Sequence, residues 1–193
     1  MGKIFRFVKK YWLLILISLT AVLFVVNKIL ETKIPTPVTP TPVTDKVANY
    51  RSIVLGVSTQ DEVNELLGFP LKEQYINEKK VAEYSSTNEF RNHVVTIENG
   101  KVVLIKEIVN TNDNKNSSTI IDSYGTAPYM FYDQRPSATF NLYVYPTNGI
   151  AYLGHEDGTL LEIWYFEPTT IDNFINKWGE GYGKEESKVI PKY

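Results

Sequence analysis

The hydrophobic pattern has one long apolar run, which lies near the N-terminus. No residue from Tyr11 to Val26 is charged. Together with the four residues after it, the run gives a helix of about 20 residues, the length needed to cross roughly 30 Å of hydrocarbon. We therefore predict a transmembrane helix over residues 11–30.

The charges that flank this run predict its orientation. Four basic residues precede it (Lys3, Arg6, Lys9 and Lys10), whereas only Lys28 and Lys33 lie near its other end. Because basic flanks stay on the cytoplasmic side, residues 1–10 are expected to form a cytoplasmic tail and the C-terminal part to lie outside. A cleaved signal peptide is the competing interpretation, but the residues after Val25 offer no small-x-small cleavage site.

A Pro/Thr-rich segment separates the apolar run from the rest of the chain. Residues 31–46 include Pro35, Pro37, Pro40 and Pro42, which fix the backbone dihedral φ and exclude both helix and sheet. At about 3.1 Å per residue, such a spacer is extended and semi-rigid. The globular part is expected over residues 47–183, followed by a charged tail at 184–193.

The first half of the globular part reads as a helix followed by strands. Thr59 and Glu62 form a capping-box pattern ahead of an amphipathic stretch, and Gly68 supplies a stop. After a polar stretch, runs of β-forming residues at 93–98 and 101–109 meet at Asn99-Gly100, a strong hairpin signal. These elements define a first unit of about residues 50–109.

The same order recurs after a polar loop. Ser117 or Ser118 can cap a helix that Gly125 ends, and strands are predicted at 140–145, 150–153 and 159–167. Asp157-Gly158 predicts the turn before the last of these strands, and the period is 57–58 residues, measured from Gly68 to Gly125 and from Gly100 to Gly158. We therefore predict an α+β fold of tandem helix-plus-antiparallel-sheet repeats, the second over about 117–167. The alternative is chance agreement of generic elements. A closing helix is predicted at 170–178, with Thr169 or Thr170 as its cap.

The first helix carries a recognisable motif. The run from Leu55 through Gly56, Glu62 and Gly68 to Pro70 resembles the signature of the SmpA/OmlA (BamE-like) domain of outer-membrane lipoproteins. A tandem arrangement of that unit resembles the β-lactamase inhibitor protein. The resemblance implies an α+β fold and protein binding, and it brings no catalytic residues. The chain departs from the family by lacking cysteine, and thus a lipid-modified N-terminal Cys.

Strand alternation predicts which residues face the core. Aligning the two hairpin glycines pairs Val103 with Leu161 and Ile105 with Ile163, and we expect these four to point toward the helices. The opposite face would then gather aromatic side chains, and the candidate interaction surface is Tyr143, Tyr145, Trp164 and Phe166. In the alternative interpretation, the closing helix covers this face through Phe174 and Trp178.

Composition limits the kinds of ligand and reaction that the chain can support. Residues 46–193 carry 14 basic and 20 acidic residues, a balance that disfavours binding to nucleic acid. There is no cysteine, and His93 and His155 lack ligand-like neighbours. We expect no catalytic, cofactor-binding or metal-binding residues.

Two classes of function follow. The first is a non-enzymatic protein-interaction module of the cell envelope, anchored in the membrane by residues 11–30. The second is a protein that binds or hydrolyses glycans of the cell wall.

Overall fold

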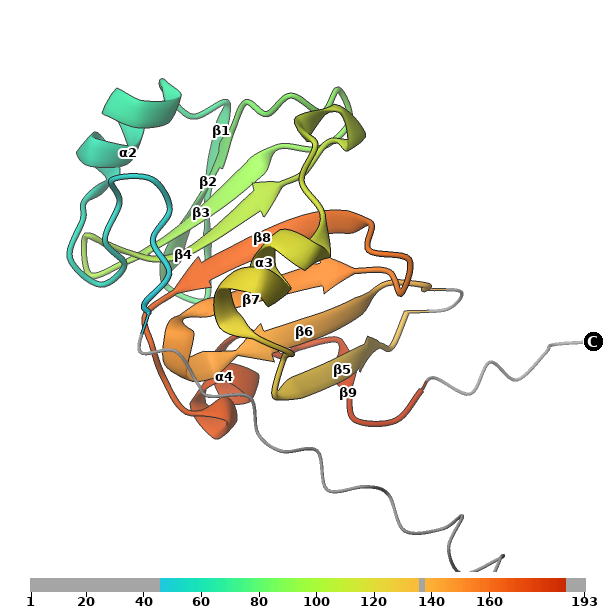
Figure 1. Cartoon of the computed structure of the whole chain (residues 1–193). Coiled ribbons are helices and arrows are strands. Elements are labelled where there is room, and N and C mark those ends of the chain that lie inside the picture. Colours follow the sequence, from blue (N-terminus) through green and yellow to red (C-terminus); the bar gives the residue numbers. More distant parts are fainter. Residues whose placement is uncertain (1–45, 136–137, 187–193) are drawn as a thin grey trace, which may run out of the picture. The chain divides into compact units, whose positions relative to one another are not determined.

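One antiparallel sheet organises the structure, a computed structural model that describes residues 46–135 and 138–186 (Figure 1). Within these residues the α-helices are α2 (Gln60–Leu67), α3 (Ser117–Tyr124) and α4 (Ile171–Trp178), with 3-10 turns η1 (Thr111–Asp113) and η2 (Pro146–Asn148). The strands are β1 (Lys72–Ile76), β2 (Lys79–Tyr84), β3 (His93–Glu98), β4 (Lys101–Ile108), β5 (Tyr129–Asp133), β6 (Asn141–Tyr145), β7 (Ile150–Gly154), β8 (Leu160–Phe166) and β9 (Tyr182–Gly183).

The sheet order places the two halves of the chain side by side. The order is β1-β2-β3-β4-β8-β7-β6-β5-β9, and all neighbours pair antiparallel. The predicted α+β class is confirmed. Among residues 46–135 and 138–186, no helix is both long and apolar enough to span a bilayer. The transmembrane helix predicted at 11–30 and the spacer lie outside the described residues, apart from Lys46 at the end of the spacer.

The elements of the two halves correspond at nearly constant offsets. α2 and α3 begin 57 residues apart, as do β1 and β5, and the helix-ending Gly68 and Gly125 share nearly the same backbone dihedrals. The central pairing of β4 with β8 joins Leu104 to Phe166, Lys106 to Trp164 and Ile108 to Glu162. A residue of β4 and its counterpart in β8 are 58 positions apart, so Leu104 corresponds to Glu162 and Ile108 to Phe166. The first pair therefore maps onto the last, and Lys106 maps onto its own partner Trp164. A local two-fold axis thus passes between Lys106 and Trp164.

Two β-bulges change which residues face inward, so the prediction for Val103 and Leu161 is wrong. The pairing skips Val103 in the first hairpin and Leu161 in the second, each three residues after the hairpin glycine. A bulge shifts the strand by one residue, so Val102 and Leu160 are buried toward α2 and α3 instead, whereas Val103 and Leu161 are only half-buried. The predicted positions of Ile105 and Ile163 are confirmed, since both are buried on the face of α2 and α3.

Four strands were missed by the sequence analysis. β1 and β2 occupy the stretch interpreted as polar, and β5 and β9 lie outside the predicted strands. β1 is exposed at all five positions, so it has no alternation of apolar and polar residues to detect. Its hairpin turn uses Asn77 and Glu78, both with positive φ, instead of an Asn-Gly pair.

Helices cover both faces of the sheet. We name the face under α2 and α3 the helix-pair face and the opposite one the α4 face. On the helix-pair face, Val63 of α2 packs with Tyr50, Ile53 and Ile105. Figure 1 shows α2 and α3 over this face. On the α4 face, Phe174 packs against Phe166, with ring centroids 4.9 Å apart.

Cap residues explain where the helices begin. The Thr59 backbone N–H donates to the Glu62 carboxylate over 2.6 Å, as the capping box predicts. α3 is capped by Asn116, which accepts from the Ser118 backbone N–H over 3.0 Å, in place of the predicted serines. α4 begins after the cap residue Thr170, as predicted.

Candidate functional site

The predicted aromatic surface does not exist as one exposed patch. Tyr143 and Tyr145 lie on the helix-pair face beside Tyr152, whereas Trp164 and Phe166 lie on the α4 face. Trp164, Phe166 and Tyr145 are each 1% exposed. The prediction is wrong because α3 covers the two tyrosines and α4 covers the other two. The alternative interpretation, in which the closing helix covers this face through Phe174 and Trp178, holds for Trp164 and Phe166 but not for the two tyrosines.

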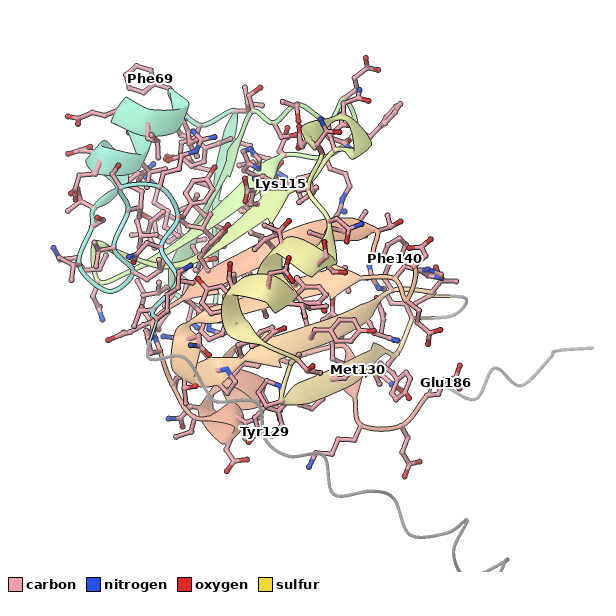
Figure 2. The ribbon with its side chains drawn as sticks, viewed as in Figure 1. Phe69, Lys115, Tyr129, Met130, Phe140 and Glu186 are labelled. Atoms are coloured by element: carbon pink, nitrogen blue, oxygen red, sulfur yellow. The ribbon has the colours of Figure 1, made fainter. Side chains whose placement is uncertain are left out.

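Exposed apolar side chains gather instead at the β1 edge of the sheet. Within the eight residues from Phe69 to Ile76, Phe69 is 85% exposed, Leu71 65%, Tyr75 75% and Ile76 48%. Figure 2 shows the Phe69 ring pointing away from the end of α2. Exposed apolar side chains that cluster along the chain can mark an interaction site. We define residues 69–76 as the β1 edge.

Among the residues that the structure describes, β1 is an edge strand, so some of its backbone N–H and C=O groups have no strand partner. The β1–β2 hairpin has a two-residue turn and closes on the pair Ile76 and Lys79. Such a turn closes on a hydrogen-bonded pair, and hydrogen-bonded pairs alternate with pairs whose N–H and C=O groups point outward. The outward groups of β1 therefore belong to Glu73 and Tyr75.

The charges on β1 are satisfied within the domain. Lys72 pairs with Glu83 at 3.6 Å, and Glu73 pairs with Lys80 at 2.9 Å. The side-chain amide of Gln60 on α2 also donates to Glu73. These contacts lower the pKa of Glu73, chiefly through the hydrogen bond from Lys80. The edge therefore presents no unbalanced charge that would repel another strand.

The opposite edge of the sheet is covered by the chain itself. Gly183 pairs with Tyr132, and Tyr182 pairs with Asp133. The Tyr182 ring meets the Trp164 ring edge-on, with centroids 5.9 Å apart. β5 and β1 occupy corresponding places in the two halves, so an extended segment already docks at one end of this sheet.

A charged cluster lies on the α4 face beside the two-fold axis. The Lys106 ammonium lies 3.8 Å from the centroid of the Trp164 ring. The indole N–H donates to Glu162 over 2.6 Å, and the second carboxylate oxygen accepts from Arg91. Desolvation lowers the pKa of Lys106, and the charge of Glu162 partly opposes that shift. The cluster explains how a glutamate remains buried on this face.

A second buried carboxylate lies on the helix-pair face. Glu107, 6% exposed, accepts from Lys115 over 2.6 Å and from the Tyr165 hydroxyl over 3.1 Å. Burial raises the pKa of Tyr165, and the charge of Glu107 raises it further. The nearby Tyr50 hydroxyl is buried and has no hydrogen-bond partner among residues 46–135 and 138–186.

His93 predicts a dependence of stability on pH. Its Nδ1 accepts the Ile108 backbone N–H over 3.0 Å, and burial lowers its pKa. Because the unfolded state binds the proton more readily, the stability that His93 contributes is present above about pH 6.5 and is lost below it. We expect His93→Gln to flatten the stability profile between about pH 7 and 5.5. Urea unfolding across this range tests it, and an unchanged slope contradicts it.

In the described part of the chain, the His, Asp and Glu side chains form no group able to hold a metal ion. His155 lies 3.2 Å from Asp157 in the exposed turn between β7 and β8, which is a local contact.

Comparisons with known proteins leave function open. No protein-family profile and no curated protein matches the sequence. Among solved structures, Bacillus subtilis YjgB, a DUF4309 family protein, aligns at 11% identity and a TM-score of 0.37, covering 61% of this chain and 84% of that one. A cysteine-rich secretory protein of Staphylococcus aureus, SAV1118, aligns at 11% identity and 0.39, covering 65% and 47%. Both likenesses are too distant to assign an activity.

Proposed function

We propose that the chain is a membrane-anchored, extracytoplasmic protein-interaction module that binds an extended polypeptide segment along the β1 edge. The observation that carries this proposal is the combination of outward backbone groups at Glu73 and Tyr75 with four exposed apolar side chains. Strand addition uses both parts, because main-chain hydrogen bonds supply affinity and side-chain contacts supply specificity.

We propose an extended segment as the partner because one already pairs with the opposite edge of the sheet. There, β9 pairs with β5 in antiparallel register, although only two residue pairs are formed. A partner strand on β1 would extend the same ladder at the corresponding position. Tyr75 and Ile76 are successive residues of β1 and point to opposite faces, so the partner should carry apolar side chains at two successive positions, one for each face.

The remaining parts of the proposal come from the sequence. We propose that the two halves are tandem copies of one helix-plus-sheet unit, with the matched offsets of α2 and α3 in support. The SmpA/OmlA-like motif around Gly68 supports protein binding by resemblance. The apolar run at 11–30 and its basic flank support an anchor in the cell membrane with the domain outside.

A pair of substitutions at Tyr75 tests the mode of binding. Tyr75→Ala removes the phenol and keeps the backbone N–H, whereas Tyr75→Pro removes both. Proline is tolerated on an edge strand where the N–H faces solvent, so both variants should melt like the parent. Peptides selected from a random display library on the full chain should bind Tyr75→Pro at least about fivefold more weakly than Tyr75→Ala, the worth of one hydrogen bond.

Two outcomes would contradict the proposal. Equal affinities for the two variants would mean that the backbone of β1 makes no contact with the peptide. Concentration-dependent dimerisation of the full chain that Tyr75→Pro abolishes would instead assign the edge to a second copy. Sedimentation velocity on the chain without peptide distinguishes that case from binding of a foreign strand.

A further inference from the structure

A cavity of about 220 Å³ lies between α3 and the helix-pair face. Its floor is apolar and is formed by Ile120 of α3, Ile150 of β7, and Leu160 and Ile163 of β8. These four side chains are buried, at 4–5% exposure. The cavity is well separated from the β1 edge, since β8 is four strands away from β1 in the sheet order.

The two halves differ beside their helices. In the first half, Ile53 and Leu55 fill the space next to α2 and belong to its core. At an offset of 57 residues, the corresponding positions are Asn110 and Asn112. The loop that carries them turns toward the first half, where the Asn110 side chain donates to the Thr87 carbonyl over 2.9 Å. Ile53 and Leu55 therefore have no apolar counterparts at these two positions, although Ala48 and Val109 pack into the core under α3.

Aromatic and amide side chains form the walls and rim of the cavity. The lining includes the half-buried Tyr124 and Tyr165 and the exposed Asn49, Asn116 and Thr119, which we assign to the walls and to the rim by their exposure. Both Asn49 and Thr119 are exposed, and neither side chain makes a hydrogen bond with any other residue that the structure describes. The rim therefore offers amide and hydroxyl groups without net charge.

One end of the cavity is charged but internally balanced. Lys115 and Tyr165 both line it, and both donate to the buried carboxylate of Glu107. The ammonium of Lys115 is thus neutralised where it meets the cavity. An anionic ligand would have to compete with Glu107 for this cation, and a cationic ligand would be repelled by it.

We propose that this cavity binds a single neutral sugar ring. A cavity of roughly 150 Å³ holds a benzene molecule, so about 220 Å³ accommodates one six-membered ring with substituents. The aromatic walls suit the apolar faces of a pyranose, and the amide and hydroxyl rim suits its hydroxyl groups. The apolar floor disfavours a fully polar ligand, and the balanced charge disfavours an ionic one.

Saturation-transfer NMR on the full chain tests this site directly. The chain should be held in a detergent without a sugar headgroup, and the probes are neutral methyl pyranosides, with cyclohexanecarboxylate and benzylamine as charged rings of similar size. We expect saturation transfer to the pyranosides in preference to the charged rings. Asn49→Ala should weaken binding about fivefold, the worth of one hydrogen bond. Thr119→Phe should abolish it, because a ring then occupies the opening.

The controls separate this site from the β1 edge. Tyr75→Pro should leave the pyranoside signal unchanged, and Thr119→Phe should leave peptide binding unchanged, so either proposal can fail alone. Melting temperatures of the variants confirm that they fold. Absence of transfer to every pyranoside, preference for a charged ring, or a signal that Thr119→Phe leaves intact would each overturn the proposal.

Discussion

Replacing Trp164 with Ala is expected to lower the free energy of unfolding by about 3–5 kcal/mol, the usual cost of removing a large buried aromatic side chain. The side chain is 1% exposed and lies 6.3 Å from the Phe174 ring and 5.9 Å from the Tyr182 ring, measured between centroids. The substitution therefore loosens both α4 and β9, the two segments that cover this part of the α4 face. Total stabilities are typically about 5–15 kcal/mol, so the loss is a large fraction.

Thermal melting measures this effect most simply. For a domain of this size, the loss corresponds to a fall in melting temperature of roughly 10–20 °C. Trp178→Ala is a suitable control, because that residue is half-buried at the end of α4, with Lys79 and Lys177 over its ring. Its removal should cost clearly less. A melting temperature that moves by no more than the control would show that Trp164 lies outside the core.

Separating the two halves is expected to abolish folding of the first. A fragment of residues 46–112 keeps β1 to β4 but loses β8, which pairs with β4 at five positions and contributes Tyr165 to the first core. Chains with so small a core are marginally stable at best. We expect circular dichroism to show no cooperative melting for this fragment, whereas residues 46–186 should melt in one transition.

Mixing the fragments provides the matched control. Residues 113–186 contain β8 and α4, so the two fragments together restore the β4–β8 ladder and both sides of the core. Cooperative melting of the mixture but of neither part would locate the missing stability in the shared interface. Cooperative melting of 46–112 alone would instead show that the first half is an independent domain.

Local signals in the sequence were sufficient for the helices and the central hairpins. Asn99-Gly100 and Asp157-Gly158 marked two turns because glycine adopts the positive φ that such turns need, 75° at Gly100 and 94° at Gly158. Thr59 and Thr170 marked helix starts because their side chains can satisfy free backbone N–H groups. Turns and helix caps depend on residues only a few positions apart, so they can be predicted from one sequence.

The faces of the sheet could not be predicted in the same way. Alternation correctly separated Ile105 and Ile163 from Trp164, but it cannot indicate which face is covered when both are apolar. The covering of Trp164 depends on where α4 packs, which is a long-range contact. The β1 edge was missed for a related reason, since its exposed Tyr75 and Ile76 lack the pattern of a half-buried strand.

The axis between Lys106 and Trp164 has a consequence for the ancestry of the chain. If a single unit once paired with an identical copy through β4, the residue on the axis faced itself. Two lysines there would repel each other. In one polypeptide the two positions can differ, and here a lysine ammonium lies 3.8 Å from the centroid of an indole ring. A symmetric homodimer, in which both positions carry the same residue, cannot form that contact, so the central interaction of this sheet requires two unlike halves.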